Sequence, residues 1–294
     1  MISNSAMLPS ACFKLGWETE MIKGLGLLTA AGLLAAVGAA SPARADKLDD
    51  IINSGTLRCA VTLDFPPMGS RDADNNPVGF DVDTCNDLAK ALGVKPVIVE
   101  TPFPQRIPAL LSGKADIGVA STSNTLERAK TIGFSNPYFV FKFDILARKG
   151  AGITDYKSQK GHSVGSTAGT YEALALEKDV KAWNDPHGSF HPYQSQADVF
   201  LALSQGQIDA TDVTSTVAAA IVQSGKYPNL EITGEAPYED DYVCLIALRG
   251  EQGVLNYLNL FISHQVRTGR YQELYNKWVG PGKAPDLTIP GVYE

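Results

Sequence analysis

The chain has 294 residues, of which 44% are hydrophobic and 19% charged, and its net charge at neutral pH is −7. This length and composition are typical of a globular protein with one or two cores. The acidic charge and the lack of a basic run argue against a nucleic-acid partner.

Residues 21–45 (MIKGLGLLTAAGLLAAVGAASPARA) have the three parts of a secretory signal peptide. A lysine near the start is followed by an apolar stretch and by an A-R-A end at 43–45. The apolar stretch is interrupted by glycine and is short for a membrane span. Residues 1–20 do not resemble the start of such a peptide, so Met21 is the more natural start. We therefore expect residues 1–45 to be a signal peptide and the rest of the chain to be exported to the periplasm.

The chain after this peptide begins with alternating strand and helix patterns. Short apolar runs predict strands at 56–62, 95–100 and 115–120. Between them lie an amphipathic helix at 81–93 and a short helix at 105–114, each with a glycine near its end. This order predicts a doubly wound α/β lobe.

A second series of the same kind follows. The segments 162–168 and 208–213 have strand patterns, and helices are predicted between them at 170–180 and 197–207. The order of strand, helix, helix and strand indicates a second lobe.

The last elements are a strand at 241–249 and two helices at 253–269 and 270–280. The apolar faces of these helices need a core, and the first lobe is the candidate.

We therefore predict an α/β protein of two lobes, each a doubly wound sheet flanked by helices. Residues 46–143 and 242–294 form lobe 1, and residues 144–241 form lobe 2. Two extended hinge strands near 142–148 and 238–247 join the lobes. In such a fold a ligand lies between the lobes, at the carboxyl ends of the strands.

Removal of the signal peptide leaves three cysteines, Cys59, Cys85 and Cys244. The odd number leaves at least one free thiol unless the chain pairs with another. An oxidising compartment permits a bridge between Cys59 in its strand and Cys85 in the next helix. The alternative is that all three are buried as small apolar side chains. No cysteine or histidine spacing suggests a zinc site.

Residues 161–165 match G-x-S-x-G, the pattern of a hydrolase nucleophile elbow. An elbow needs a strand that ends at the motif, but residues 153–160 are polar and the motif itself has the strand pattern. The useful feature is the turn that follows, before the helix at 170–180. Backbone N–H groups at a helix N-terminus bind a carboxylate well, and Thr167 or Thr170 can also cap the helix there.

Five stretches spread over about residues 55–220 resemble the polar amino-acid-binding proteins of bacterial ABC importers, which have the type II periplasmic binding protein fold. The longest matching stretch, residues 106–138, stays in register throughout. The others are GTLRCAVTLDFPPMG, PVGFDVDTCNDLAKALG, SVGSTAGTYEA and GQIDATDVTSTVAA. The resemblance implies an exported, monomeric receptor that captures an amino-acid-like ligand between two lobes. It also implies delivery to a membrane permease, with no enzymatic activity, cofactor or metal ion.

The resemblance also assigns roles to residues of the expected site. Arg128 matches the arginine that grips the ligand carboxylate, and its planar fork suits two oxygens. Ser121 and Ser123 match positions that contact the ligand, and Phe65 and Phe103 match the aromatic wall. The full set of expected ligand-binding residues is Phe65, Phe103, Ser121, Ser123, Arg128, Thr167, Gly169, Thr170 and Asp212.

Each of these residues also has a purely structural interpretation. Arg128 can be a surface residue paired with Glu127, and the phenyl rings can be core packing. Thr125 is expected mainly to cap the helix that carries Arg128. Arg106, on the preceding helix, is a weaker candidate for a second cation in the cleft.

Two positions depart from the family pattern. The family commonly has a carboxylate for the ligand ammonium where this chain has Thr214. Asp212 lies two residues earlier, on the same face of an extended segment. Either Asp212 takes over this role, or the ligand lacks a free primary ammonium, as in an opine, a betaine or an ectoine. Thr62 replaces a second acidic residue, which gives no support for a basic ligand.

A cyclohexadienyl or arogenate dehydratase-like enzyme on the same fold is the alternative function. Such an enzyme needs a general acid or base in the cleft, and Asp64, Asp212 and Glu172 are the candidates. Turnover of prephenate or arogenate would distinguish the two functions. A periplasmic sensor domain is the third interpretation, and the sequence provides no fused kinase to support it.

Overall fold

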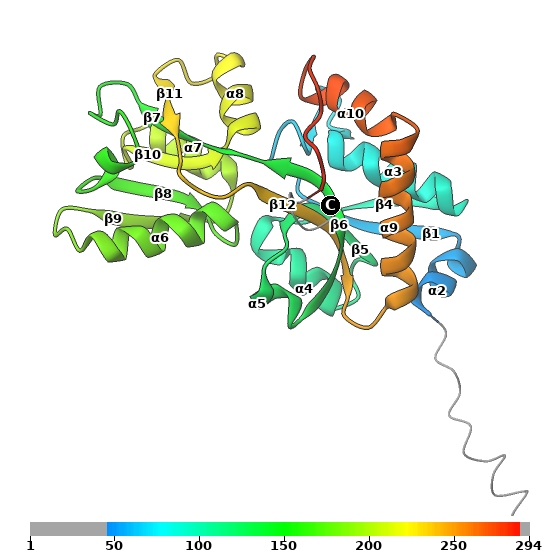
Figure 1. The fold of residues 1–294 in the computed structure, drawn as a ribbon. Coiled ribbons are helices and arrows are strands. Elements are labelled where there is room, and N and C mark those ends of the chain that lie inside the picture. The colour runs from blue at the N-terminus through cyan, green and yellow to red at the C-terminus, as the bar shows by residue number, and fades with distance from the viewer. Residues whose placement is uncertain (1–45, 289–294) are drawn as a thin grey trace, which may run out of the picture. The chain divides into compact units, whose positions relative to one another are not determined.

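The computed structural model describes residues 46–288, which form an α/β structure with two five-stranded sheets (Figure 1). The predicted signal peptide and its start at Met21 lie outside the described residues. Within residues 46–288 no helix has the length and apolar character needed to cross a membrane.

The first sheet has the strand order β4-β1-β5-β12-β6. β1 pairs in parallel with β4 and β5, whereas β12 runs antiparallel to both β5 and β6. Its strands are β1 (Thr56–Val61), β4 (Lys95–Glu100), β5 (Ile117–Ser123), β6 (Ile132–Phe141) and β12 (Asp241–Leu248). The associated elements are α2 (Lys47–Ser54), β2 (Ser70–Arg71), β3 (Pro77–Val78), α3 (Phe80–Leu92), η1 (Phe103–Gln105), α4 (Arg106–Leu111), α5 (Leu126–Ala129), α9 (Gln252–Arg267) and α10 (Arg270–Trp278).

The second sheet has the order β11-β7-β10-β8-β9 and is built from the middle of the chain. β8 pairs in parallel with β9 and β10, and β7 runs antiparallel to β10 and β11. Its strands are β7 (Phe143–Arg148), β8 (Ser163–Thr167), β9 (Ser189–Tyr193), β10 (Ala210–Thr214) and β11 (Leu230–Glu235). The remaining elements are η2 (Lys157–Gln159), α6 (Tyr171–Trp183), α7 (Gln196–Ser204) and α8 (Ser215–Gln223).

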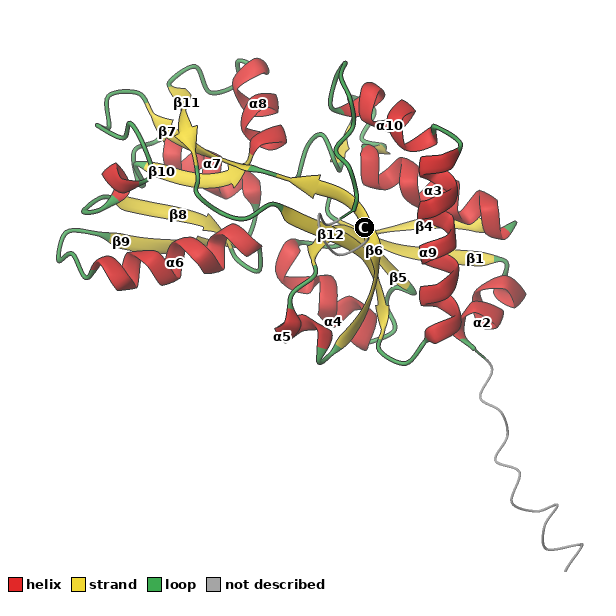
Figure 2. Cartoon of the chain, viewed as in Figure 1, coloured by secondary structure: helices red, strands yellow, loops and turns green. Residues whose placement is uncertain are grey.

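The chain passes between the two sheets twice. β6 ends at Phe141 in the first sheet and β7 begins at Phe143 in the second, and β12 returns the chain from β11 to the first sheet (Figure 2). The predicted two-sheet α/β class is therefore confirmed. β9 was not predicted from the sequence, and its place at the sheet edge suits Pro192, which cannot donate a backbone hydrogen bond.

The C-terminal helices pack on the first sheet, as their apolar faces predicted. The ring of Phe80 in α3 lies 5.2 Å from that of Phe139 in β6 and 6.2 Å from that of Tyr271 in α10. Edge-to-face aromatic pairs at these separations are favourable. One core therefore joins elements from the two ends of the described chain.

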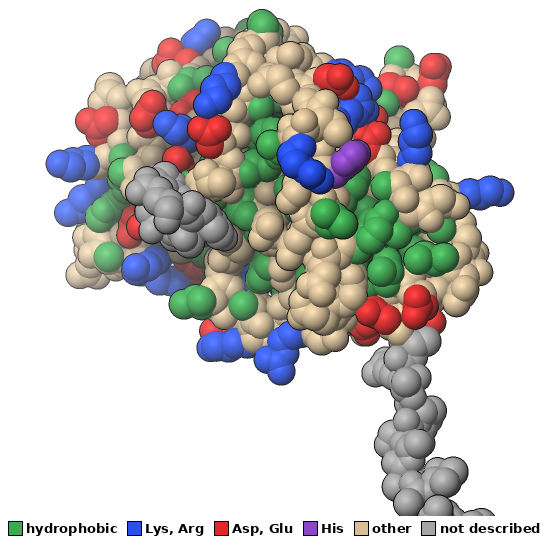
Figure 3. All heavy atoms as spheres, turned by 45° about the vertical axis from the view of Figure 1, so that its right-hand side comes forward, with side chains coloured by type: hydrophobic (Ala, Val, Ile, Leu, Met, Phe, Trp, Pro, Cys, Tyr) green, Lys and Arg blue, Asp and Glu red, His purple; other side chains and the backbone are tan. Residues whose placement is uncertain are grey.

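The exposed surface mixes charges of both signs. In the view of Figure 3, Asp and Glu side chains are interspersed with Lys and Arg over the described part of the chain. This face has no continuous basic surface of the kind that binds a nucleic-acid backbone.

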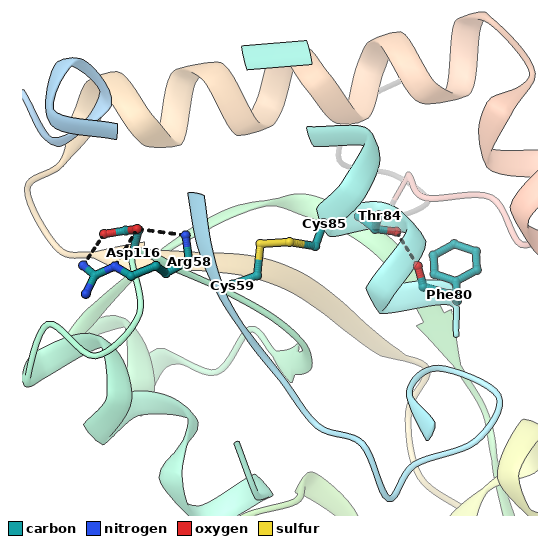
Figure 4. Close-up of a disulfide and its surroundings, with 6 residues drawn as sticks. All are labelled: Arg58, Cys59, Phe80, Thr84, Cys85 and Asp116. Atoms are coloured by element: carbon teal, nitrogen blue, oxygen red, sulfur yellow. Dashed lines mark hydrogen bonds and ion pairs between the residues drawn. A yellow bond between two sulfur atoms is a disulfide. The ribbon is translucent and has the colours of Figure 1, made fainter. Parts of the chain in front are cut away.

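A disulfide joins the first strand to the helix that follows it. Cys59 in β1 and Cys85 in α3 form the bridge, so the pairing that the sequence left open is present (Figure 4). Both side chains are buried, and Cys244 is a buried free thiol. Next to the bridge, Arg58 Nη2 lies 2.6 Å from Asp116 Oδ1 and ties β1 to the start of β5.

Replacing Cys59 and Cys85 together with alanine should destabilise the protein by about 3 kcal/mol, because the bridge closes a loop of 26 residues in the unfolded chain. Thermal melts followed by circular dichroism should show a midpoint lower by roughly 6 to 12 °C. Cys244→Ala is the matched control for the loss of a buried sulfur. A double variant that melts like this control would show that the bridge contributes little.

Candidate ligand site

A pocket lies between the two sheets, near the carboxyl ends of β5 and β10. Its cavity volume in this arrangement is about 10 Å³, far below the range for small-molecule sites, so the lining side chains nearly fill it. The first-sheet side contributes Phe65, Phe103, Arg106, Ser121, Ser123 and Phe141, the second-sheet side contributes Thr170, Tyr171, Glu172 and Thr214, and β12 contributes Asp241.

The structure brings together five of the nine expected ligand residues in the lining of this pocket. These are Phe65, Phe103, Ser121, Ser123 and Thr170. Arg128 and Gly169 meet beside them, and Thr167 and Asp212 have their side-chain partners elsewhere.

Three phenyl rings form the apolar wall. The ring of Phe65 lies 4.9 Å from that of Phe103 and 5.8 Å from that of Phe141, both in edge-to-face geometry. Phe141, the last residue of β6, was missed because its run of apolar residues predicts only a buried strand. Such an aromatic wall suits the carbon chain of a small ligand.

Arg128 has hydrogen-bonding capacity left for a ligand. Its Nη1 donates to the carbonyl of Ser123 at 3.1 Å, and its Nη2 donates to the carbonyl of Gly169 at 2.8 Å. A guanidinium has five N–H donors, so three remain for a carboxylate. Burial lowers the pKa of Arg128, and the charges of Asp241 and Glu172 oppose that shift. An arginine remains charged under such conditions.

The helix that carries Arg128 is short and capped as the sequence predicted. The Thr125 hydroxyl accepts a hydrogen bond from the backbone N–H of Arg128 at 3.3 Å. Glu127 pairs with Lys130 instead of with Arg128, so the surface ion-pair interpretation of this arginine does not hold.

Arg106 is a buried structural cross-link, with 3% of its surface exposed. Its Nε donates to the carbonyl of Phe103, and its Nη1 donates to those of Ala120 and Ser121. Its Nη2 donates to the carbonyl of Gly169 at 2.7 Å. Burial, together with the nearby charge of Arg128, lowers the pKa of Arg106 to about 9. Four of its five N–H donors are thus already used, which leaves little for a ligand.

The carbonyl of Gly169 therefore accepts hydrogen bonds from two guanidinium groups on the first-sheet side of the protein, those of Arg106 and Arg128. It lies in the turn between β8 and α6 with a φ of 81°, a left-handed conformation that glycine adopts readily. A Cβ at this position would lie 3.2 Å from the Cα of Pro104. The turn is thus a close contact between the two halves. The following residue, Thr170, caps α6 by accepting from the N–H of Ala173, as expected.

Ser121 is held in an unusual backbone conformation at the pocket. Its φ is 46°, in the left-handed region that non-glycine residues seldom adopt. Its N–H donates to the Tyr138 hydroxyl at 2.9 Å, and its own hydroxyl donates to Asp81 Oδ2 at 3.2 Å. Tyr138 donates in turn to Asp81 Oδ1 at 2.7 Å. This buried network fixes the Ser121 peptide, as expected for backbone strain at a binding site.

Two carboxylates line the pocket. Asp241 accepts a hydrogen bond from the Ser123 hydroxyl at 2.9 Å, and burial raises its pKa to about 6. Burial also raises the pKa of Glu172 to about 7, with a further contribution from the charge of Asp241. The sequence named Glu172 only for the enzyme alternative, and it missed Asp241. The three acidic residues at 239–241 have the composition of a solvated surface loop. The sequence alone does not show that Asp241 begins the strand β12 and is buried there.

Asp212 has partners within the second-sheet side of the protein. It accepts from Gln159 Nε2 at 2.9 Å and from the Tyr238 hydroxyl at 2.6 Å. The pocket is lined instead by Thr214, the position at which the sequence resemblance implied a carboxylate. The structure therefore does not bring Asp212 to the other candidate residues.

Two further expected features have simple structural roles. Thr167 donates from its hydroxyl to Gln196 Oε1 at 3.1 Å. Ser163 of the G-x-S-x-G motif lies at the start of β8, and its hydroxyl donates to the carbonyl of Gln207. The motif is therefore part of a strand, as predicted, and not a nucleophile elbow.

Comparison with known proteins identifies the family. The model for bacterial extracellular solute-binding proteins, family 3, matches residues 57–281. The chain belongs to this family. The family 3 protein is therefore a solute-binding protein, which agrees with the receptor predicted from the sequence.

The relatives and structures similar to this family 3 protein cover most of its length. It is 28% identical to the glutamine-binding protein of a Bacillus subtilis ABC transporter, over 86% of this chain and 92% of the relative. It is also 28% identical to the L-cystine-binding protein of Escherichia coli, over 85% and 92% of the two chains. An ancestral arginine-binding protein solved with arginine has a TM-score of 0.72 and 31% identity, covering 77% of this chain and 99% of the other. This structural similarity confirms the type II periplasmic binding protein fold.

Proposed function

We propose that this family 3 protein is exported to the periplasm and captures an amino acid between its two sheets for delivery to an ABC transporter permease. The observation that carries the proposal is Arg128, a cation with three free donors beside the pocket. The relatives' names point the same way, since they describe glutamine-, cystine- and arginine-binding proteins.

The two sheets correspond in this proposal to two lobes that close on the ligand. Lobe 1 comprises residues 46–143 and 242–294, lobe 2 comprises residues 144–241, and the hinge lies where β6 leads into β7 and where β12 begins. The bonds from Arg106 and Arg128 to Gly169 join the two lobes. A ligand that contacts both lobes favours the closed arrangement by its higher affinity for it.

The binding role is favoured over the dehydratase role. The solved ancestral amino-acid-binding protein described as a precursor of cyclohexadienyl dehydratase resembles this chain with a TM-score of 0.71 and 29% identity. That solved protein is itself an amino-acid-binding protein. We propose a monomeric receptor without enzymatic activity, and prephenate consumption is the result that would favour the alternative.

A thermal-shift panel on the purified protein, refolded to remove any bound ligand, tests the proposal. The panel contains the standard amino acids, cystine, an opine, betaine, ectoine and prephenate. A ligand at a hundred times its dissociation constant should stabilise the protein by about 2.7 kcal/mol, a shift of several degrees. The proposal predicts such a shift with at least one amino acid. A shift with prephenate alone, accompanied by its consumption, would contradict it.

A further inference from the structure

Glu172 and Asp241 line the same pocket and come from different elements of the fold. Glu172 is the second residue of α6, which packs on the second sheet, and Asp241 is the first residue of β12 in the first sheet. Their exposed fractions are 3% and 9%. Both residues line the pocket, together with Thr170 and Thr214.

Neither carboxylate is paired directly with a cation. Among residues 46–288, no lysine, arginine or histidine nitrogen lies within 4.0 Å of either group. Arg106 and Arg128 attract them only at longer range, and the hydrogen bonds of Arg106 go to backbone carbonyls. Buried carboxylates without a close counter-ion are costly, so a cation between them would be strongly favoured.

We propose that Glu172 and Asp241 together accept the α-ammonium group of the ligand, next to the α-carboxylate held by Arg128. This inference rests on the proposed function and specifies its ligand as an α-amino acid with a free ammonium. An ammonium has three N–H donors, enough for both carboxylates and for one further acceptor such as the Thr214 hydroxyl.

The arrangement also favours a bound ammonium electrostatically. Without a cation, two charged carboxylates that line one pocket repel one another. An ammonium between them turns this repulsion into two attractions. A ligand with a carboxylate but no ammonium gains nothing from the pair. Glu172 and Asp241 thereby select zwitterions over simple acids.

The variants Glu172→Gln and Asp241→Asn test the inference, since both keep the size of the side chain and remove its charge. Isothermal titration calorimetry would use L-glutamine and L-arginine, each compared with its analogue without the α-ammonium, glutaramic acid and δ-guanidinovaleric acid. For the amino acid that binds the wild type, each variant should bind about 10- to 100-fold more weakly. Binding of the deaminated analogue should be unchanged or stronger.

Two further variants make the test specific. Glu177→Gln removes an exposed carboxylate of the same helix α6 that pairs with Lys181, and it should bind like the wild type. Asp212→Asn removes the carboxylate that the sequence favoured, and it should change affinity less than either pocket variant. Circular dichroism melts on every variant verify that the protein is folded.

The outcomes separate this inference from the proposed function. If the wild type binds an amino acid and both pocket variants bind it within about threefold, the inference is overturned and the receptor function stands. A loss of affinity confined to Asp212→Asn would also overturn the inference. It would support Asp212, the residue expected from the sequence, as the partner of the ligand ammonium. If the wild type binds only the analogues that lack an ammonium, the ligand class is wrong. If it binds none of the four compounds or the wider panel, the proposed function itself fails.

Discussion

Replacing Arg128 with alanine is expected to weaken amino-acid binding by roughly 150- to 5000-fold. The guanidinium is the cation with free donors beside the pocket, and its removal leaves the ligand carboxylate desolvated without a counter-charge. Breaking a buried charge pair by removing one partner costs about 3 to 5 kcal/mol, which corresponds to that range of affinities. The measurement is a calorimetric titration with the amino acid that binds the wild type most tightly.

Two matched variants sharpen this prediction. Arg128→Lys keeps the charge and loses the planar fork, so its affinity should fall between those of the wild type and the alanine variant. Lys130→Ala removes an exposed cation next to the same short helix, α5, and should leave affinity unchanged. Arg128→Ala binding within about fivefold of the wild type would show that the carboxylate is held elsewhere.

Replacing Arg106 with methionine is expected to lower the free energy of unfolding by about 3 to 5 kcal/mol. The substitution keeps much of the apolar length and removes donors from the carbonyls of Phe103, Ala120, Ser121 and Gly169. Three of these four residues, Phe103, Ala120 and Ser121, are buried, so water replaces their bonds poorly. Urea denaturation followed by circular dichroism measures the change.

The same substitution should also weaken ligand binding, because it removes one of the two bonds that tie Gly169 to the first-sheet side. Arg267→Met, at an exposed position late in α9, is the control for exchanging an arginine for methionine. A loss of stability below about 1 kcal/mol for Arg106→Met would mean that its hydrogen bonds are replaceable, and Arg106 would then be free to serve the ligand.

The two-sheet fold could be predicted because its signals are local. Apolar periodicity and glycine stops place the helices and strands, and the sequence pattern of α3 ends at Gly93, which has the left-handed φ of 71°. β9 was not predicted because its sequence lacks such local signals. Its residues are half exposed, and it contains Pro192, so nothing in its sequence distinguishes it from a loop.

The site was predictable where it lies within one continuous stretch. Residues 106–138 contain Ser121, Ser123 and Arg128, and the resemblance in that stretch places all three at or beside the pocket. Asp241 escaped prediction because its burial depends on β12 crossing back to the first sheet from more than a hundred residues away. No local sequence pattern indicates that two segments so far apart in the chain will pair.

Asp212 shows the limit of periodicity within a single strand. Alternation puts Asp212 and Thr214 on one face of β10, yet they have different surroundings. Thr214 ends the strand and precedes α8, so its side chain reaches the pocket. Asp212 is engaged by Tyr238 and Gln159, which come from other parts of the second-sheet side. The sequence separates these residues, so their contact appears only in the folded structure.

The most direct test of the central claim is a calorimetric titration of the refolded wild type and Arg128→Ala with the standard L-amino acids and L-cystine. The account predicts that at least one of these binds the wild type at one site per chain, with a dissociation constant in the micromolar range or below, and that the heat is lost in the variant. Equal binding by both proteins, or no binding to the wild type by any of these amino acids, would contradict it.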